Sequence, residues 1–278
     1  MHPTCKKQFF TAIFTVVFMV LVMPSAAQDI PFIPPVYNYT TDHYDAGNQN
    51  WAIAQGSNGV IYFGNDNGLL SYDGVNWKLH NLPNNLSVKS IFIDSHDHYE
   101  RIYVGSFEEF GYFESNETNQ LIYHTLRHRI AKYQFHNDEI WNIYPFNGKL
   151  YFQSFSTIFV YDGKEIRIQK PYPAVLYFFP VGKKMFAQLI GNDFCLFDGE
   201  NFHPVFTRDR WNDDNVIALL PFKDDWLVVT SKNGLYRFSE KGFTLTPWNI
   251  PAWKELKQST INRAIVSGDS YIFGTINS

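Results

Sequence analysis

Several histidines and carboxylates lie close together in this sequence and could ligate a metal or exchange protons. His96-Asp97-His98 sets two imidazoles one residue apart, and Glu108-Glu109, Asp213-Asp214 and Asp224-Asp225 are adjacent carboxylates. Imidazoles bind Zn²⁺, and glycoside hydrolysis needs two carboxylates that face one substrate. Neighbours on a strand point to opposite faces, however, and the polar stretch around His96 is typical of a solvated hairpin loop. We therefore predict no metal site and no acid/base pair at these positions.

A second group of residues combines aromatic rings with amide and guanidinium donors. It consists of Asn50 and Trp51, Trp141 and Asn142, and Asn262 and Arg263. Binding sites for sugars commonly join an aromatic face to such donors. The plainer interpretation is that the two tryptophans only fill the space between packed sheets. Which interpretation applies depends on the elements that carry these residues.

Those elements come from a phrase that recurs through the chain. Its clearest copy is GVIYFGNDNGLLSYDGVNW, from Gly59 to Trp77, and it contains two apolar runs and an Asp-Gly turn. The aromatic residue near this turn recurs with spacings of 41, 48, 36 and 41 residues, at Tyr72, Phe113, Tyr161, Phe197 and Phe238. Repeats of about 40 to 50 residues with several short strands each are typical of β-propeller blades.

The repeat predicts an all-β chain of four-stranded antiparallel blades. The blades are expected at 51–80, 88–126, 139–173, 174–206 and 216–248, and a sixth copy is cut off after residues 270–275. The two tryptophan pairs and Asn262-Arg263 then begin innermost strands, whose first residues line the axial mouth of a propeller. The insert at 127–138 is expected to hold a helical turn and to protrude on one face.

A propeller closes on itself to remove its sheet edges, so about five and a half blades suggest part of a larger ring. We therefore expect residues 51–278 to be an incomplete propeller, the front of a longer protein. Residues 28–50 form an extended N-terminal segment, in which 36–41 are the candidate for a clasp strand that pairs with the last blade.

Residues 1–27 resemble a secretory signal peptide. Lys6 and Lys7 precede an apolar run from Phe9 to Met23, and Ser25-Ala26-Ala27 supplies small residues for cleavage before Gln28. An uncleaved membrane anchor is the alternative, because the run is marginal in length for a span. The mature chain would be periplasmic and would keep only Cys195, so it can form no intrachain disulfide.

Composition narrows the classes of function further. The formal net charge is −4 and the mature part has no lysine and arginine cluster, so we predict no contact with nucleic acid. The sequence has no glycine-rich phosphate loop and no metal motif, so we expect no cofactor. Aromatic residues make up 18% of the chain, which suits stacked sheets with large inner faces.

The residues of the clearest repeat resemble the two-component regulator propeller repeat. Gly59, Tyr62, Gly64, Gly68 and Leu69 match its first half, and Tyr72, Asp73, Gly74 and Trp77 match its second. The approach Ala46 to Gln55 is similar to the opening of periplasmic sensor regions in proteins that end in a LuxR-type helix-turn-helix or in a histidine kinase with a response regulator. The likeness covers about 36–278 and is degraded in the second and fourth blades.

The resemblance implies one or two seven-bladed propellers followed by an immunoglobulin-like module, a transmembrane helix and a cytoplasmic output module. Hybrid members typically detect glycan fragments, so the expected partners are a glycan fragment or another small periplasmic ligand and the downstream modules. We predict a non-catalytic, ligand-sensing segment of a signal-transduction regulator. The alternatives are a propeller glycoside hydrolase or lyase, and a structural scaffold or truncated relic.

Overall fold

The computed structural model describes residues 35–96, 99–191 and 193–276. The chain divides into two compact units, Met1–Asn38 and Tyr39–Ser278, and all described helices and strands lie in the second. The candidate signal peptide, residues 1–27, lies outside the described ranges.

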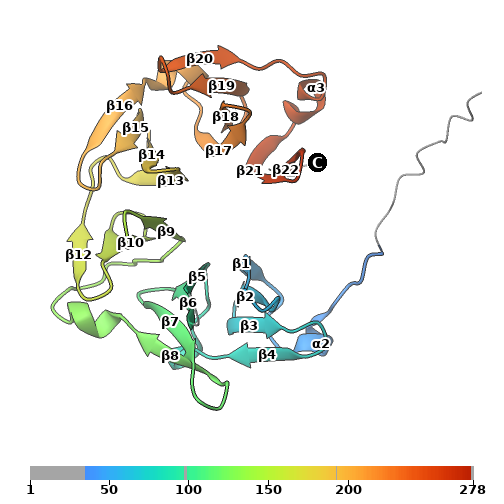
Figure 1. Ribbon diagram of the computed structural model, residues 1–278, viewed down its shortest axis with the longest axis vertical. Helices are drawn as coiled ribbons and strands as arrows, with labels where there is room; N and C mark the ends of the chain where they lie inside the picture. The colour runs from blue at the N-terminus through green and yellow to red at the C-terminus, as the bar shows by residue number, and fades with distance from the viewer. Residues whose placement is uncertain (1–34, 97–98, 192, 277–278) are drawn as a thin grey trace, which may run out of the picture. The chain divides into compact units, whose positions relative to one another are not determined.

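The fold of Tyr39–Ser278 is all-β, with five four-stranded antiparallel sheets and one two-stranded sheet. In Figure 1 the sheets follow one another as propeller blades. The strands of blade one are β1 (Asn50–Gln55), β2 (Ile61–Asn65), β3 (Gly68–Tyr72) and β4 (Trp77–His80). Those of blade two are β5 (Ser90–His96), β6 (Tyr99–Gly105), β7 (Phe110–Ser115) and β8 (Leu121–Thr125). Those of blade three are β9 (Asn142–Phe146), β10 (Lys149–Gln153), β11 (Ile158–Tyr161) and β12 (Ile166–Gln169).

The later blades repeat this order. Those of blade four are β13 (Val175–Val181), β14 (Lys184–Leu189), β15 (Phe194–Phe197) and β16 (Phe202–Phe206). Those of blade five are β17 (Val216–Phe222), β18 (Asp225–Thr230), β19 (Leu235–Ser239) and β20 (Thr244–Pro247). Blade six has β21 (Thr260–Ser267) and β22 (Ser270–Ile276), and β22 is a second strand as the repeat predicts. The short helices are α2 (Thr41–Tyr44), α3 (Trp253–Leu256), η1 (Pro83–Asn85), η2 (Arg127–Ile130) and η3 (Arg208–Trp211).

The repeated aromatic residue occupies the same place in each four-stranded blade. Each lies on the third strand opposite a second-strand residue, in the pairs Ile61–Tyr72, Ile102–Phe113, Leu150–Tyr161, Met185–Phe197 and Trp226–Phe238. The ring then packs toward the preceding blade, as Phe197 does on Tyr151 and Phe238 on Phe186. The repeat assignment is therefore confirmed.

Tyr72 is half-buried, whereas its four counterparts are buried: Phe113, Tyr161, Phe197 and Phe238. The other four aromatic residues are covered by the sheet before theirs. The side chains that contact the Tyr72 ring are Tyr39 and Trp77, and its hydroxyl hydrogen-bonds that of Tyr39 at 2.9 Å. The aromatic residue at this position is thus buried only where a preceding blade covers it.

The Asp-Gly hairpins are held by the aspartate side chain. The carboxylate of Asp162 accepts hydrogen bonds from the backbone N–H groups of Lys164 at 2.9 Å and Glu165 at 2.8 Å. Gly163 takes a φ of 95°, which a residue with a side chain rarely adopts. The same arrangement recurs at Asp73 and Asp198, which explains why the motif marks these turns.

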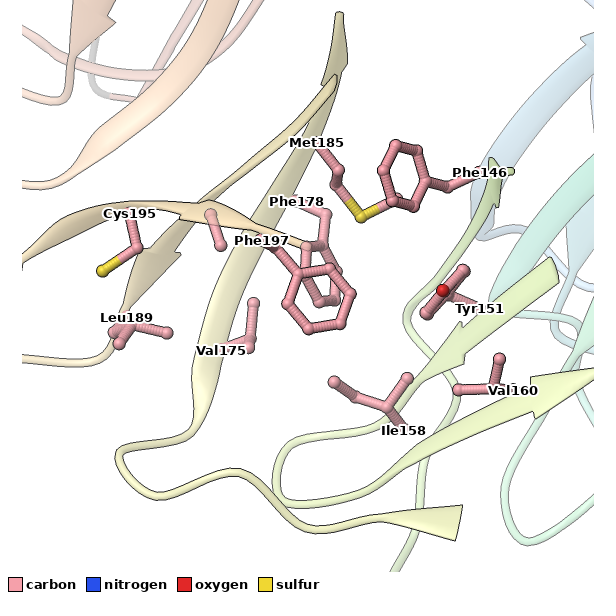
Figure 2. Close-up of a cluster of buried hydrophobic side chains, with 11 residues drawn as sticks. Phe146, Tyr151, Ile158, Val160, Val175, Phe178, Met185, Leu189, Cys195 and Phe197 are labelled. Atoms are coloured by element: carbon pink, nitrogen blue, oxygen red, sulfur yellow. The ribbon is translucent and has the colours of Figure 1, made fainter. Parts of the chain in front are cut away.

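The hydrophobic core lies between consecutive blades. Figure 2 shows Tyr151, Ile158 and Val160 of blade three facing Phe178 and Phe197 of blade four. The Phe178 and Phe197 rings are 5.1 Å apart. Burial, together with the nearby Asp193 charge, raises the pKa of the Cys195 thiol in the same cluster to about 11. This cysteine therefore belongs to the core.

The insert at 127–138 is exposed over most of its residues, but its apolar side chains pack against blade three. It contains the predicted helical turn, η2, but Ile130 is buried and the Tyr133 and Phe135 rings lie 5.2 Å and 5.7 Å from that of Phe159. Its apolar residues pack on blade three, because burying apolar surface lowers the free energy more than leaving these side chains in water.

The expected clasp strand over 36–41 is not formed. Residues 36–40 carry no strand, and α2 begins at Thr41. The Thr40 N–H donates to Nδ1 of His43 at 3.1 Å, a local bond that favours the helical turn over an extended chain. No helix in the described part of the chain is long and apolar enough to cross a membrane.

Candidate functional site

A pocket of about 730 Å³ lies where the first strands of the blades approach one another. Its lining comes from blades one, two, three, four and six: Trp51, Ala52, Ile53, Lys89, Ser90, Ile91, Trp141, Asn142, Ile143, Gln153, Ser154, Phe155, Val175, Leu176, Tyr177, Ile190, Asn262 and Arg263. Successive first strands contact one another from β1 to β21. The pocket therefore occupies the axial position that the repeat predicts.

Five of the six candidate residues line this pocket: Trp51, Trp141, Asn142, Asn262 and Arg263. The sixth, Asn50, is absent from the lining. Its Oδ1 accepts a hydrogen bond of 2.8 Å from Nδ2 of Asn65, a residue that also bonds the backbone of Gly47. Asn50 thus helps to fix the loop before blade one.

Trp51 and Lys89 form one wall of the pocket. The Lys89 Nζ lies 3.4 Å from the centroid of the Trp51 ring and 3.6 Å from Oε1 of Glu139. The Trp51 Nε1–H donates to Oδ1 of Asp66 at 2.8 Å. The indole is therefore held at its edge and on its face, and its position is set before any ligand arrives.

A second charged side chain reaches the pocket from blade six. The Arg263 guanidinium lies 5.9 Å from the centroid of the Tyr177 ring on blade four. Arg263 sits beside a bulge, where the pairing of β21 with β22 shifts between Ile261 and Arg263. Bulges re-aim side chains at strand ends and often occur next to functional sites.

Trp141 and Gln153 bring unpaired polar atoms to the same region. Gln153 is 3% exposed and its Nε2 donates to the Val175 carbonyl at 2.7 Å, but its Oε1 has no partner among the described residues. The Trp141 Nε1–H is likewise buried without a partner there, and the Phe155 ring packs edge-on at 5.0 Å from the indole. Of three such atoms in the described chain, the third, Nε1 of Trp211, lies in the core.

No carboxylate that the structure describes lines the pocket. Asp138 contacts the lining residue Ser154, whose hydroxyl donates to it at 2.8 Å, and it also accepts a hydrogen bond from the Tyr133 hydroxyl at 2.9 Å. Burial acts to raise the pKa of Asp138, but these bonds and one from the His136 N–H leave it lower than usual. Asp138 thus already accepts hydrogen bonds from three groups of the chain, and it is not among the lining residues.

The other carboxylates and histidines named from the sequence do not meet. Glu109 is buried and accepts from the Tyr123 and Thr125 hydroxyls, while Glu108 bonds the Asn137 N–H. Asp97 and His98 lie outside the described residues. Within the described ranges, no group of three His, Cys, Asp or Glu residues is placed to hold a metal ion.

Lys89, Gln153, Phe155 and Tyr177 are lining residues that sequence reasoning missed. Lys89 could have been found, because its N–H bonds the Gly105 carbonyl just as the Trp141 N–H bonds that of Gln153. The two residues hold the same place before the first strand of their blades. Extending the blade alignment to the second blade would have identified the lysine.

Solved structures with the same fold include extracellular domains of bacterial proteins described as one-component and hybrid two-component systems. One, from a B. thetaiotaomicron protein described as a one-component system, has a TM-score of 0.61 and 13% identity over 83% of this chain. Another, from a B. thetaiotaomicron protein described as a hybrid two-component system, has a TM-score of 0.59 and 13% identity over 83% of this chain. A computationally designed protein, Ika8, also matches, with a TM-score of 0.54 and 12% identity over 82% of this chain. The resemblance to a propeller sensor region is thus confirmed at the level of the fold.

The chain spans about a third of the length of the two sensor structures, 31% and 32%. No family model and no curated protein sequence matches it.

Proposed function

We propose that Tyr39–Ser278 is a ligand-sensing part of an exported signal-transduction regulator, and that its axial pocket binds a glycan fragment. The observation that carries this proposal is the pair of unpartnered polar atoms, Gln153 Oε1 and Trp141 Nε1, in residues that line one pocket. A buried polar atom without a partner costs about 1–3 kcal/mol. A sugar hydroxyl, which both donates and accepts, could satisfy the two together after a small rotation of their side chains.

The rest of the lining suits the same ligand class. Trp51 presents a ring that is 40% exposed, and Phe155 presents one that is 58% exposed. Asn142 and Asn262 line the same pocket. Apolar ring faces with a few placed polar groups are the usual composition of a small-molecule site.

The pocket supports binding without catalysis. A glycoside hydrolase would need two carboxylates from different blades facing the substrate, and the described lining has none. The sensor domains with the same fold are extracellular, which supports export of this chain as well. The scaffold alternative is less well supported, because a surface that only holds a neighbour has no reason to leave polar atoms unpaired in a pocket.

Nuclear magnetic resonance of the exported chain with a panel of oligosaccharides tests the proposal. We expect saturable shifts of the Trp51 and Trp141 indole N–H signals with at least one oligosaccharide, and recovery of that oligosaccharide unchanged after incubation. Phe155→Ala should weaken binding at least tenfold, whereas Phe243→Ala, another half-exposed phenylalanine outside the pocket, should not. Absence of binding across the panel, or equal binding by the Phe155 variant, would refute the pocket as a sugar site.

A further inference from the structure

The pocket is lined by more positive than negative side chains. Its lining contains two cationic side chains, Lys89 and Arg263, and among the described residues no anionic one. The Lys89 charge is already compensated by Glu139 at 3.6 Å and by the face of Trp51. Arg263 has no carboxylate within ion-pair distance in the described part of the chain, and its ring neighbour Tyr177 is neutral.

The place of Arg263 in the fold is also unusual. Blades one, four, five and six have a register shift near the start of the first strand, and the residue just after the shift is Ala52, Tyr177, Ala218 or Arg263. Only blade six has a charge there. The exposed guanidinium is therefore presented at the axial pocket by a feature that elsewhere carries a neutral side chain.

A guanidinium group has donors in a planar fork that matches the two oxygens of a carboxylate or the oxygens of a sulfate. The groups around it add further donors, namely the amides of Asn142 and Asn262 and the unpartnered Trp141 N–H. The Arg263 guanidinium itself carries donors only, and no carboxylate of the described residues lines the pocket. A ligand that supplies acceptor oxygens and a negative charge fits this pocket better than a neutral one.

We infer that the axial pocket selects saccharides that carry a carboxylate or sulfate group, and that Arg263 pairs with this oxyanion. The inference rests on the proposed function and narrows its ligand class. The sugar ring lies against the aromatic wall, and the charged substituent extends toward blade six.

Calorimetric titration with matched disaccharides tests the inference. The two disaccharides of each pair share a backbone and differ in one group: a glucose unit against a glucuronic acid unit, a galactose unit against a galacturonic acid unit, or an unsulfated unit against a 6-sulfated unit. At low salt we expect at least one acidic disaccharide to bind at least ten times more tightly than its neutral partner. This difference in affinity should become smaller in 0.5 M NaCl. Whether the carboxylated or the sulfated member binds more tightly identifies the source of the oxyanion.

Variants separate the inference from the proposed function. Arg263→Met should weaken binding of the acidic ligand at least tenfold and of the neutral ligand less than twofold. Arg263→Lys should restore part of the lost affinity. Arg210→Met, which removes an exposed arginine outside the pocket, is the matched control and should bind as the unaltered chain does. Equal affinity for neutral and acidic partners, or an equal loss of both in Arg263→Met, would overturn the inference and leave the sugar site standing. If no member of any pair binds, both the inference and the proposed function fail.

Discussion

The Lys89 ammonium lies 3.4 Å above the centre of the Trp51 ring, and this contact joins the first strand of blade one to the segment that enters blade two. The lysine side chain is 12% exposed and also faces Glu139, which precedes blade three. One cation thus links three blades beside the pocket.

Removing this cation should loosen the axial end of the blades. A cation over an indole contributes about 0.5–2 kcal/mol. We expect Lys89→Met, which keeps the apolar stem, to lower the free energy of unfolding by about 1–2 kcal/mol in urea denaturation. Lys89→Arg keeps the charge and should lose less than half of this. Equal stability of the Met and unaltered chains would show that the contact adds nothing.

A close approach between blades gives the second prediction. Gly105 ends β6, and a Cβ placed there would lie 2.5 Å from Cγ2 of Ile140. Gly274 has the corresponding place on β22, where the nearest atoms are 3.8 Å away. Gly105→Ala should therefore destabilise the chain by about 1–3 kcal/mol through overpacking. Gly274→Ala should stay within about 0.5 kcal/mol. Similar thermal denaturation of the two variants would contradict the inferred packing.

His80 should make stability depend on mildly acidic pH. Burial, with a smaller effect from Lys78, lowers the pKa of this imidazole from 6.5 to about 4. The unfolded chain then binds the proton first, so stability is complete above pH 6.5 and falls as the pH decreases to about 4. We expect a loss of about 1–2 kcal/mol over this range of pH. In His80→Gln the free energy of unfolding, measured by urea titration, should change less between pH 7 and pH 4. An unchanged dependence on pH would exclude His80 as its source.

The aspartate turns should respond at lower pH. The backbone N–H groups of Glu165 and Lys164 hold the pKa of Asp162 below its usual 3.8. Its stabilising effect is present above that value and is lost as the pH falls through the lower, folded-state pKa. Asp162→Asn keeps an acceptor oxygen but loses the charge, so it should lower stability somewhat at pH 7 and reduce the further loss of stability below pH 4. Asp162→Ala should lower stability at both, as followed by circular dichroism. A loss of stability in Asp162→Asn as steep as that of the unaltered chain would contradict this role.

Processing of the N-terminus remains a prediction from the sequence. Expressed with its leader in a Gram-negative host, the chain should reach the periplasm and begin at Gln28, because Ser25-Ala26-Ala27 provides the small residues that signal peptidase needs. Ala27→Leu should block cleavage. Mass spectrometry of the periplasmic protein decides this, and an intact leader in the membrane fraction of the unaltered chain would favour an anchor.

The sequence by itself determined the repeat, the strand order within each blade and the Asp-Gly hairpins. These are local properties: an alternation of apolar residues fixes a strand, and an aspartate next to a glycine fixes its turn within four residues. The starts of the first strands align for the same reason. The repeat therefore predicts an axial position for the pocket residues Trp51, Trp141, Asn142, Asn262 and Arg263.

The tertiary structure decided how side chains from different blades meet. In the folded chain the 127–138 insert packs on Phe159, Tyr72 is half-buried, and Lys89 contacts both Trp51 and Glu139. These outcomes depend on the angle and distance between sheets, which are set by long-range packing of side chains from separate repeats. No pattern within one repeat encodes that geometry, and for this reason the pocket's unpaired atoms and its excess of positive charge became visible only in three dimensions.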